Sequence, residues 1–306
     1  MEVSLIRLFS VLFSLVIVAC AGTPEMSPAP ACASAARFAG EGKARVAALS
    51  ELPANERAEV ALDMVACLEH PDPRVRDGFA YETYAAIMRG GLLDETGLRA
   101  LKAALLDELA AAGGDPAGFR GPFAALILSE VVRTDRITPW MTGEERGELV
   151  AAAAAYMSGL ADYRGYSDTD GWRHGVAHTA DIFLQLSLNE ALTRDEADAI
   201  LAVIAVKAGT SDHAYIFGEP ERLAAPVLYL SRRGLLTPEE WTDWFMGLWP
   251  EDDPLREVAY ASAAALARKH NLTAFAESVY VSADVSGDEA FAPVGAASLA
   301  FIRSLP

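Results

Sequence analysis

The sequence predicts an all-α fold in which helical hairpins stack into an α-α superhelix of the HEAT or armadillo kind. Two observations predict it: helical spacing of apolar residues through most of the chain, and one form of helix start that recurs at a nearly constant interval. Strand-like alternation is scarce. Apolar residues are spaced by three and four in the segments 58–68, 98–109, 123–132, 149–160, 176–188 and 199–206.

The recurring helix starts are capping boxes, in which a hydroxyl accepts a hydrogen bond from a free backbone N–H and a Glu three residues later reaches back. Successive starts are 44 to 51 residues apart, close to the length of one HEAT or armadillo unit. An irregular helical bundle is the alternative, because capping boxes occur in any helical protein. The starts lie at Thr142, Thr193, Thr237 and Ser286, with a related one at Asp94.

Residues 1–19 have the form of a lipoprotein signal peptide. Arg7 precedes an apolar run, residues 8–19, that is too short to span a bilayer as a permanent helix. The run ends with Ile17-Val18-Ala19-Cys20, which resembles the lipobox at which bacterial lipoproteins are processed. We therefore expect Cys20 to carry a lipid. A secretory signal cleaved nearby is the alternative, and either signal would export the protein.

Residues 20–31 are the predicted tether, and residues 32–306 are the predicted single helical-repeat domain. Pro24, Pro28 and Pro30 prevent a helix in the tether. The residue after the cysteine is Ala21 and not Asp. In a Gram-negative host, this resembles the lipoproteins that are sent on to the outer membrane. We expect the protein to be anchored to that membrane by its lipid and to face the periplasm.

Charge and cysteine content narrow the partners and the compartment. The net charge of −18 would repel phosphate backbones and anionic lipid faces, which argues against a nucleic-acid partner. Lipidation of Cys20 would leave Cys32 and Cys67 as an even pair in an oxidising compartment. They can form a disulfide or remain two buried thiols, because the sequence does not fix the distance between them.

Polar, aromatic and glycine residues are concentrated between positions 162 and 181. Asp170 is a good N-cap, so we expect a helix from about Gly171. The offsets of His174, His178 and Asp181 place two imidazoles and a carboxylate on one face of that helix.

Two imidazoles one turn apart, together with a carboxylate, can bind zinc or another divalent metal. A further ligand would come from elsewhere, with Asp168, Asp170 and His213 as candidates, and Asp162 or Glu221 as a base. Gly175 stands where the H-E-x-x-H metalloprotease motif has its Glu, so that mechanism lacks its base. The alternative is structural: both histidines bind a neighbouring loop, and Asp181 orients one imidazole.

Other residues have simpler interpretations. Arg164 can clamp an anionic group or close the loop on Asp168 or Asp170, and loop closure is favoured. We expect a helix start with a structural ion pair at 219–222, and another ion pair between Arg76 and Asp77. Three tryptophans are expected in the core, at positions 241, 244 and 249.

The chain resembles the bacterial family known as domain of unknown function 2785. The resemblance covers about residues 71–234 and rests on the segments 162–166, 171–181 and 221–224, and on the 72–77 segment with Tyr81. Family members usually have Lys-Asp-Leu or a similar triplet before the Arg-Gly pair, which is Arg164-Gly165 here. This chain has Ala161-Asp162-Tyr163 at the place of that triplet. The resemblance implies a helical fold and a shared surface around His174 and His178, and it implies no activity.

Two functions follow as hypotheses. The first is a lipid-anchored binding protein whose surface holds a peptide, a protein or a small ligand, because no nucleophile–base set is recognisable. The second is a metal-dependent hydrolase that uses His174, His178 and Asp181. The expected ligand-binding residues are Arg164, Trp172, His174, His178 and Asp181.

Overall fold

The computed structural model describes residue 32 and residues 42–306. The predicted signal peptide, the lipidation site Cys20 and the tether lie outside the described residues. Within the described part, no helix is both long and apolar enough to cross a membrane.

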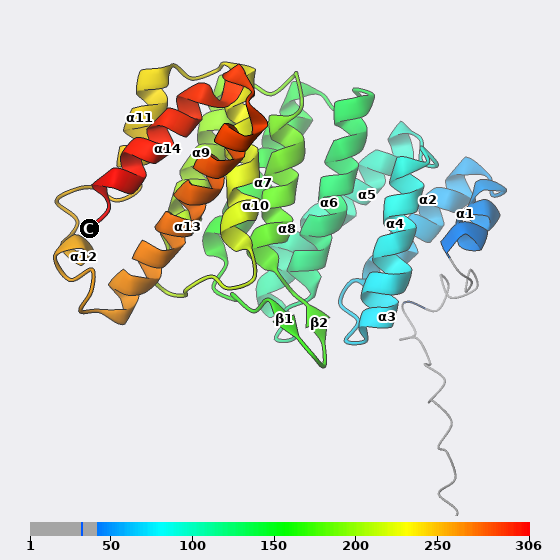
Figure 1. The fold of residues 1–306 in the computed structure, drawn as a ribbon. Coiled ribbons are helices and arrows are strands. Elements are labelled where there is room, and N and C mark those ends of the chain that lie inside the picture. Colours follow the sequence, from blue (N-terminus) through cyan, green and yellow to red (C-terminus); the bar gives the residue numbers. More distant parts are fainter. Residues whose placement is uncertain (1–31, 33–41) are drawn as a thin grey trace, which may run out of the picture.

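The fold is all-α, as predicted, and its helices stack as hairpins in two rows (Figure 1). Helices α2 (Ala54–Asp63), α5 (Glu95–Ala111), α7 (Gly143–Gly159) and α9 (Arg194–Ala208) pack side by side in the first row. Helices α4 (Glu82–Arg89), α6 (Arg120–Ile137), α8 (Gly175–Ser187), α10 (Glu219–Arg233) and α13 (Ala263–Ser286) form the second. The second-row helices run parallel, so their N-terminal ends lie at one end of the molecule (Figure 1).

The remaining elements close the two ends of the array. At the N-terminal end they are α1 (Gly42–Ser50), a 3-10 turn (Met64–Cys67), α3 (Pro73–Val75) and a π-helical turn (Arg76–Tyr81). At the C-terminal end they are α11 (Pro238–Met246), α12 (Pro254–Glu257), a 3-10 turn (Glu289–Phe291) and α14 (Ala292–Ser304). Between these ends lie a 3-10 turn (Ala112–Gly114) and a two-stranded hairpin of β1 (Tyr166–Ser167) and β2 (Gly171–Trp172).

Most of the predicted helix starts are confirmed. Thr142, Thr193 and Thr237 each form a full capping box, and Asp94 accepts a hydrogen bond from the backbone N–H of Gly97. The start predicted at Ser286 is wrong, because Ser286 is the last residue of α13. The next residue is a glycine with φ of +62°, which turns the chain out of the helix.

A ladder of arginines joins each first-row helix to the segment that precedes a later helix. Arg57, Arg99, Arg146 and Arg194 each donate to a backbone carbonyl two residues before the following N-cap, at Leu92, Trp140, Ala191 and Leu235 respectively. These donor–acceptor distances lie between 2.5 and 3.2 Å. A charge-assisted hydrogen bond thus satisfies a carbonyl at the same place in four successive units and links one unit to the next.

The buried hydrophobic residues of the described part form one core cluster, which extends from Cys32 to Phe301. Trp241 and Trp249 are fully buried, and Trp244 packs against the core, so the prediction for the three tryptophans is confirmed. Cys32 and Cys67 form a disulfide with their Cα atoms 5.2 Å apart, which decides the question that the sequence left open. This bond ties residue 32 to the turn after α2.

Candidate functional site

The candidate site lies where α6, α8 and α10 begin, beside the β1–β2 hairpin (Figure 1). The helix predicted from Gly171 is wrong at its start, because Gly171 and Trp172 form β2 and α8 begins only at Gly175. Gly171 has φ of +73°, and the Ser167 hydroxyl accepts from the Asp170 N–H, so a turn forms where an N-cap was expected.

His174 is the N-cap of α8 and has a left-handed backbone, with φ of 58° and ψ of 41°. Among the described residues it is the only non-glycine with positive φ. Such a conformation costs roughly 1–2 kcal/mol for an L-residue and is found where surrounding contacts hold it, often at functional sites. Here the His174 N–H donates to the Arg164 carbonyl at 3.1 Å, and the ring stacks on Trp172 with centroids 4.8 Å apart.

The two predicted histidines are neighbours, with ring centroids 5.9 Å apart, and both are buried. The Nδ1 of His178 lies 3.1 Å from the Pro122 carbonyl oxygen, which can only accept, so Nδ1 carries the proton. Burial, helped by Arg222, lowers the pKa of His174 to about 4. Burial, then the neighbouring His174, lowers the pKa of His178 to about 3. Both imidazoles are therefore neutral near pH 7.

A carboxylate that sequence reasoning did not place at the site faces His174. The Glu219 Oε1 atom lies 3.7 Å from His174 Nε2, which has no hydrogen-bond partner, and both side chains are buried. Burial raises the pKa of Glu219, and its Oε2 accepts from the Phe217 N–H at 2.9 Å. A ring nitrogen of His174 is thus buried, unpartnered and beside a carboxyl group.

The third predicted ligand, Asp181, is occupied by an ion pair. Arg222 binds it through both Nε, at 3.0 Å, and a terminal nitrogen. Burial raises the pKa of Asp181 against the effect of that guanidinium. In the described residues, no group of three or more His, Cys, Asp or Glu side chains is arranged to hold a metal ion. The helix start at 219–222 is confirmed, and Arg222 forms its ion pair with Asp181, which lies outside that segment.

The loop that precedes the hairpin is closed by arginines. Arg164 pairs with Asp162, not with Asp168 or Asp170, and also donates to the Pro116 carbonyl. Arg173 pairs with Asp170 and donates to the Ala117 carbonyl at 2.6 Å. These contacts tie the 162–181 segment to the loop before α6. Arg164 therefore closes a loop, as the favoured interpretation expected, but the acid that it pairs with is Asp162.

Arg76 joins the loop between β1 and β2 to the N-terminal part of the array. The buried Arg76 donates to the Asp170 carbonyl at 2.7 Å and lies over the Phe119 ring, 3.9 Å from its centroid. It also pairs with Asp77, as predicted.

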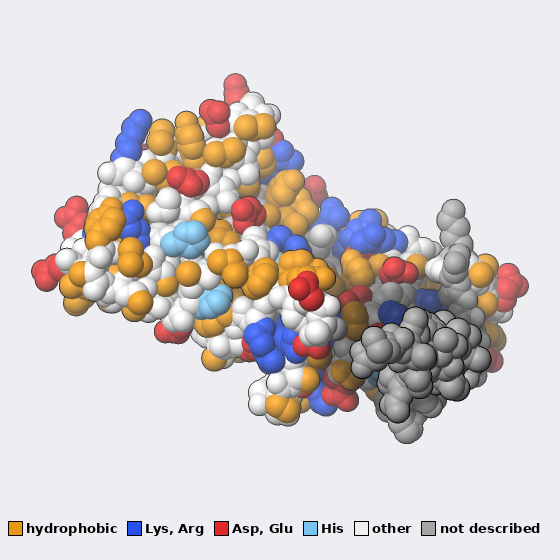
Figure 2. Space-filling view, turned by 60° about the horizontal axis from the view of Figure 1, so that its bottom comes forward, with side chains coloured by type: hydrophobic (Ala, Val, Ile, Leu, Met, Phe, Trp, Pro, Cys, Tyr) orange, Lys and Arg blue, Asp and Glu red, His pale blue; other side chains and the backbone are white. Residues whose placement is uncertain are grey.

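An open cleft of about 590 Å³ adjoins the hairpin, and its aromatic lining includes Tyr166 and Phe217. Both rings contact Trp172, at centroid distances of 5.2 and 6.0 Å. His213 also lines the cleft; it stacks on Tyr163 at 5.3 Å, and its Nε2 is buried without a partner. Tyr166 and Trp172 are 47% and 39% exposed, so the hairpin presents aromatic surface to a ligand. In Figure 2, which turns this end of the molecule toward the viewer, histidine side chains are exposed among hydrophobic ones.

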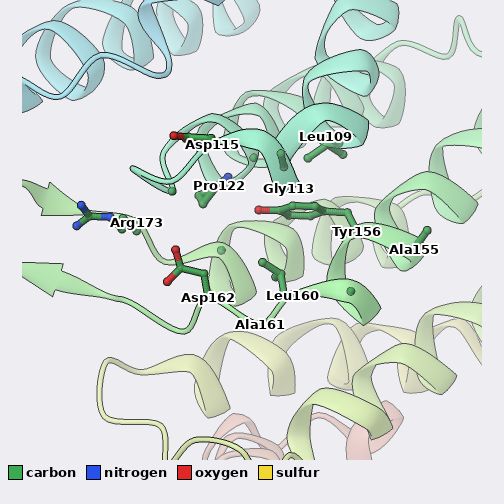
Figure 3. A pocket seen from close by; sticks show the side chains of 15 residues that line it. Leu109, Gly113, Asp115, Pro122, Ala155, Tyr156, Leu160, Ala161, Asp162 and Arg173 are labelled. Carbon is green, nitrogen blue, oxygen red and sulfur yellow. The ribbon is translucent and has the colours of Figure 1, made fainter.

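A narrower cavity of about 380 Å³ lies next to the cleft and shares Ala161, Asp162 and Arg173 with it. Figure 3 shows the Tyr156 ring across this cavity, with its hydroxyl toward the end that carries Asp115 and Asp162. That hydroxyl is buried and unpartnered, and burial together with these two carboxylates raises the pKa of Tyr156.

Sequence reasoning missed Phe217 and Tyr156, and glycines were the available signal for both. A Cβ added at Gly165 would lie 2.1 Å from the Phe217 ring. One added at Gly121 would lie 2.5 Å from the Tyr156 hydroxyl. Each ring fills space that only a glycine leaves open, but the sequence does not say which ring faces which glycine.

Comparison with known proteins places the chain in a family. The model of the family described as protein of unknown function (DUF2785) matches residues 105–281. The chain belongs to this family. The match contains the hairpin, both histidines and Arg222, while the 72–77 segment and Tyr81, which the resemblance had included, lie before it. No curated protein and no solved structure matches the chain.

Proposed function

We propose that the protein is a lipid-anchored binding protein of the periplasm, and that the surface around Arg164 to Asp181 binds a peptide, a protein or a small ligand. One observation carries this proposal: the exposed Trp172 stacks on the strained His174 and contacts two aromatic rings that line an open cleft. Exposed aromatic rings fixed by such contacts bind partners at a small entropic cost.

The contacts within the 162–181 segment hold it in one conformation, which favours a binding site over a loose surface loop as its interpretation. Backbone strain at His174 is held by hydrogen bonds and stacking, and Arg76, Arg164 and Arg173 fix the neighbouring loops. A site held in place before a ligand arrives loses less freedom when it binds. The net charge of −18 argues for a partner other than nucleic acid.

The membrane location rests on the sequence alone. Cys20 and the preceding apolar run supply the anchor, and Ala21 favours the outer membrane. A tether of small residues and prolines would hold the helical array off the membrane surface, where its cleft could meet periplasmic molecules.

Site-specific photocrosslinking in living cells tests the binding proposal. A benzophenone amino acid replaces Tyr166 at the cleft or, as a matched control, Tyr260, which is 71% exposed and outside the cleft. We expect a light-dependent adduct of defined mass at position 166 that is absent at 260 and is lost when Trp172→Ala is added. The mass separates a protein from a small ligand. Equal labelling at both positions would contradict a specific surface here.

Metal analysis separates binding from the hydrolase alternative. Purified without chelator, the protein and its His178→Ala variant are compared by mass spectrometry. Near-stoichiometric zinc, manganese or iron that is lost in the variant would overturn the binding proposal in favour of a metal site at His174 and His178.

A further inference from the structure

A second groove lies at the other end of the second-row helices, away from the hairpin. The end of α4, the start of α5 and the end of α6 enclose about 510 Å³, within the usual range for small-ligand sites. These ends face upward in Figure 1, opposite β1 and β2. The groove shares no lining residue with the cleft or with the Tyr156 cavity.

Apolar residues line this groove together with charged and polar ones. Its apolar lining consists of Ile87, Met88, Leu93, Leu98, Ile137 and Trp140. Ile137 is 56% exposed, although the other apolar residues that line the groove are buried. An isoleucine left at a groove rim above a buried aliphatic floor offers apolar area that an elongated hydrocarbon can cover.

One cation, Arg133, lines the groove without a partner. The structure gives its guanidinium no hydrogen bond, ion pair or ring contact, and among the described arginines only Arg303 shares this condition. Nearby acids are engaged elsewhere: Glu130 by Arg89, Glu95 by Arg99, and Asp94 by the Gly97 N–H. In a chain of net charge −18, an arginine left without a partner in the lining of a groove is available to an external anion.

We propose that this groove binds a monocarboxylate with a flexible apolar chain, as in a medium- or long-chain fatty acid, with the carboxylate on Arg133 and the chain along the aliphatic wall. A planar guanidinium matches one carboxylate in a two-point hydrogen bond. Asp94 and Glu95 line the same groove and would repel a doubly charged phosphate head about twice as strongly as a singly charged carboxylate. The proposal is independent of the function proposed for the hairpin cleft.

Calorimetry with decanoate tests the proposal on the full chain held in lipid nanodiscs, with empty nanodiscs as the reference for partitioning. We expect saturable binding with one decanoate per chain. Decanol, which has the same chain without the charge, should bind about tenfold more weakly, as should decanoate to Arg133→Gln. Arg133→Lys keeps the charge and should lose less than Arg133→Gln.

Two variants complete the test. Arg303→Gln removes the other unpaired arginine of the described residues and should leave decanoate affinity unchanged. Ile137→Ser should weaken decanoate and decanol alike, because it alters only the apolar wall. Circular dichroism confirms that each variant is folded. No saturable decanoate binding, or equal affinity in wild type and Arg133→Gln, would overturn the proposal.

Discussion

The neutral, buried His178 makes the stability of the fold depend on pH. Its pKa is lowered from 6.5 to about 3, mainly by burial, so below pH 6.5 the unfolded chain takes up a proton that the folded chain refuses. The stability that His178 contributes is therefore fully present above its pKa in the unfolded chain, and it is lost as the pH falls toward its pKa in the folded chain. Between about pH 7.5 and about pH 5 this one group costs about 2 kcal/mol of unfolding free energy.

His178→Gln isolates this effect, because an amide can still donate to the Pro122 carbonyl but does not titrate. Urea unfolding followed by far-ultraviolet circular dichroism gives the unfolding free energy of both proteins at each pH. We expect the loss between about pH 7.5 and about pH 5 to be about 2 kcal/mol smaller in the variant. His174, Glu219 and Asp181 titrate in both proteins, so their contribution cancels in the difference. Parallel pH profiles would refute the assignment of a neutral, buried imidazole.

Three further predictions address the anchor and the packing. Cys20→Ser should abolish incorporation of radiolabelled palmitate and release the protein from membranes; labelling that persists would exclude Cys20 as the lipid site. Gly165→Ala should destabilise the fold by about 3 kcal/mol or more, because the added Cβ meets the Phe217 ring. Gly159→Ala, where a Cβ meets open space, should be neutral or stabilising. Equal unfolding midpoints for the two variants would contradict the packing around Gly165. Arg146→Met should cost about 3 kcal/mol in urea unfolding, because it leaves the buried Asp135 carboxylate without its cation and the Ala191 carbonyl without a donor. An unchanged midpoint would contradict a stabilising role for the ladder.

The structural findings change the interpretation of the histidine motif. Asp181 is engaged by Arg222, and the buried carboxyl group that faces His174 is Glu219. Much of the 162–181 segment holds loops together: Gly165 leaves room for the Phe217 ring, and Arg164 and Arg173 donate to backbone carbonyls. The part that remains open to a partner is the aromatic surface of Tyr166 and Trp172.

The sequence by itself determined the helical class, three of the four capping boxes and the segment that carries the candidate site. These features depend on contacts within one or two helical turns, so neighbours in the chain decide them. The failed box shows the limit of such reasoning: Ser286 has a glutamate three residues on, but Gly287 turns the chain first.

Tertiary structure alone decided what the site residues contact. The left-handed backbone of His174, the pairing of Asp181 with Arg222 and the approach of Glu219 bring together groups from different helices. The Cys32–Cys67 disulfide likewise needed the distance between two segments. Local patterns place a side chain on a helix face, but the partner opposite that face depends on how the hairpins stack, which spacing along the chain does not encode.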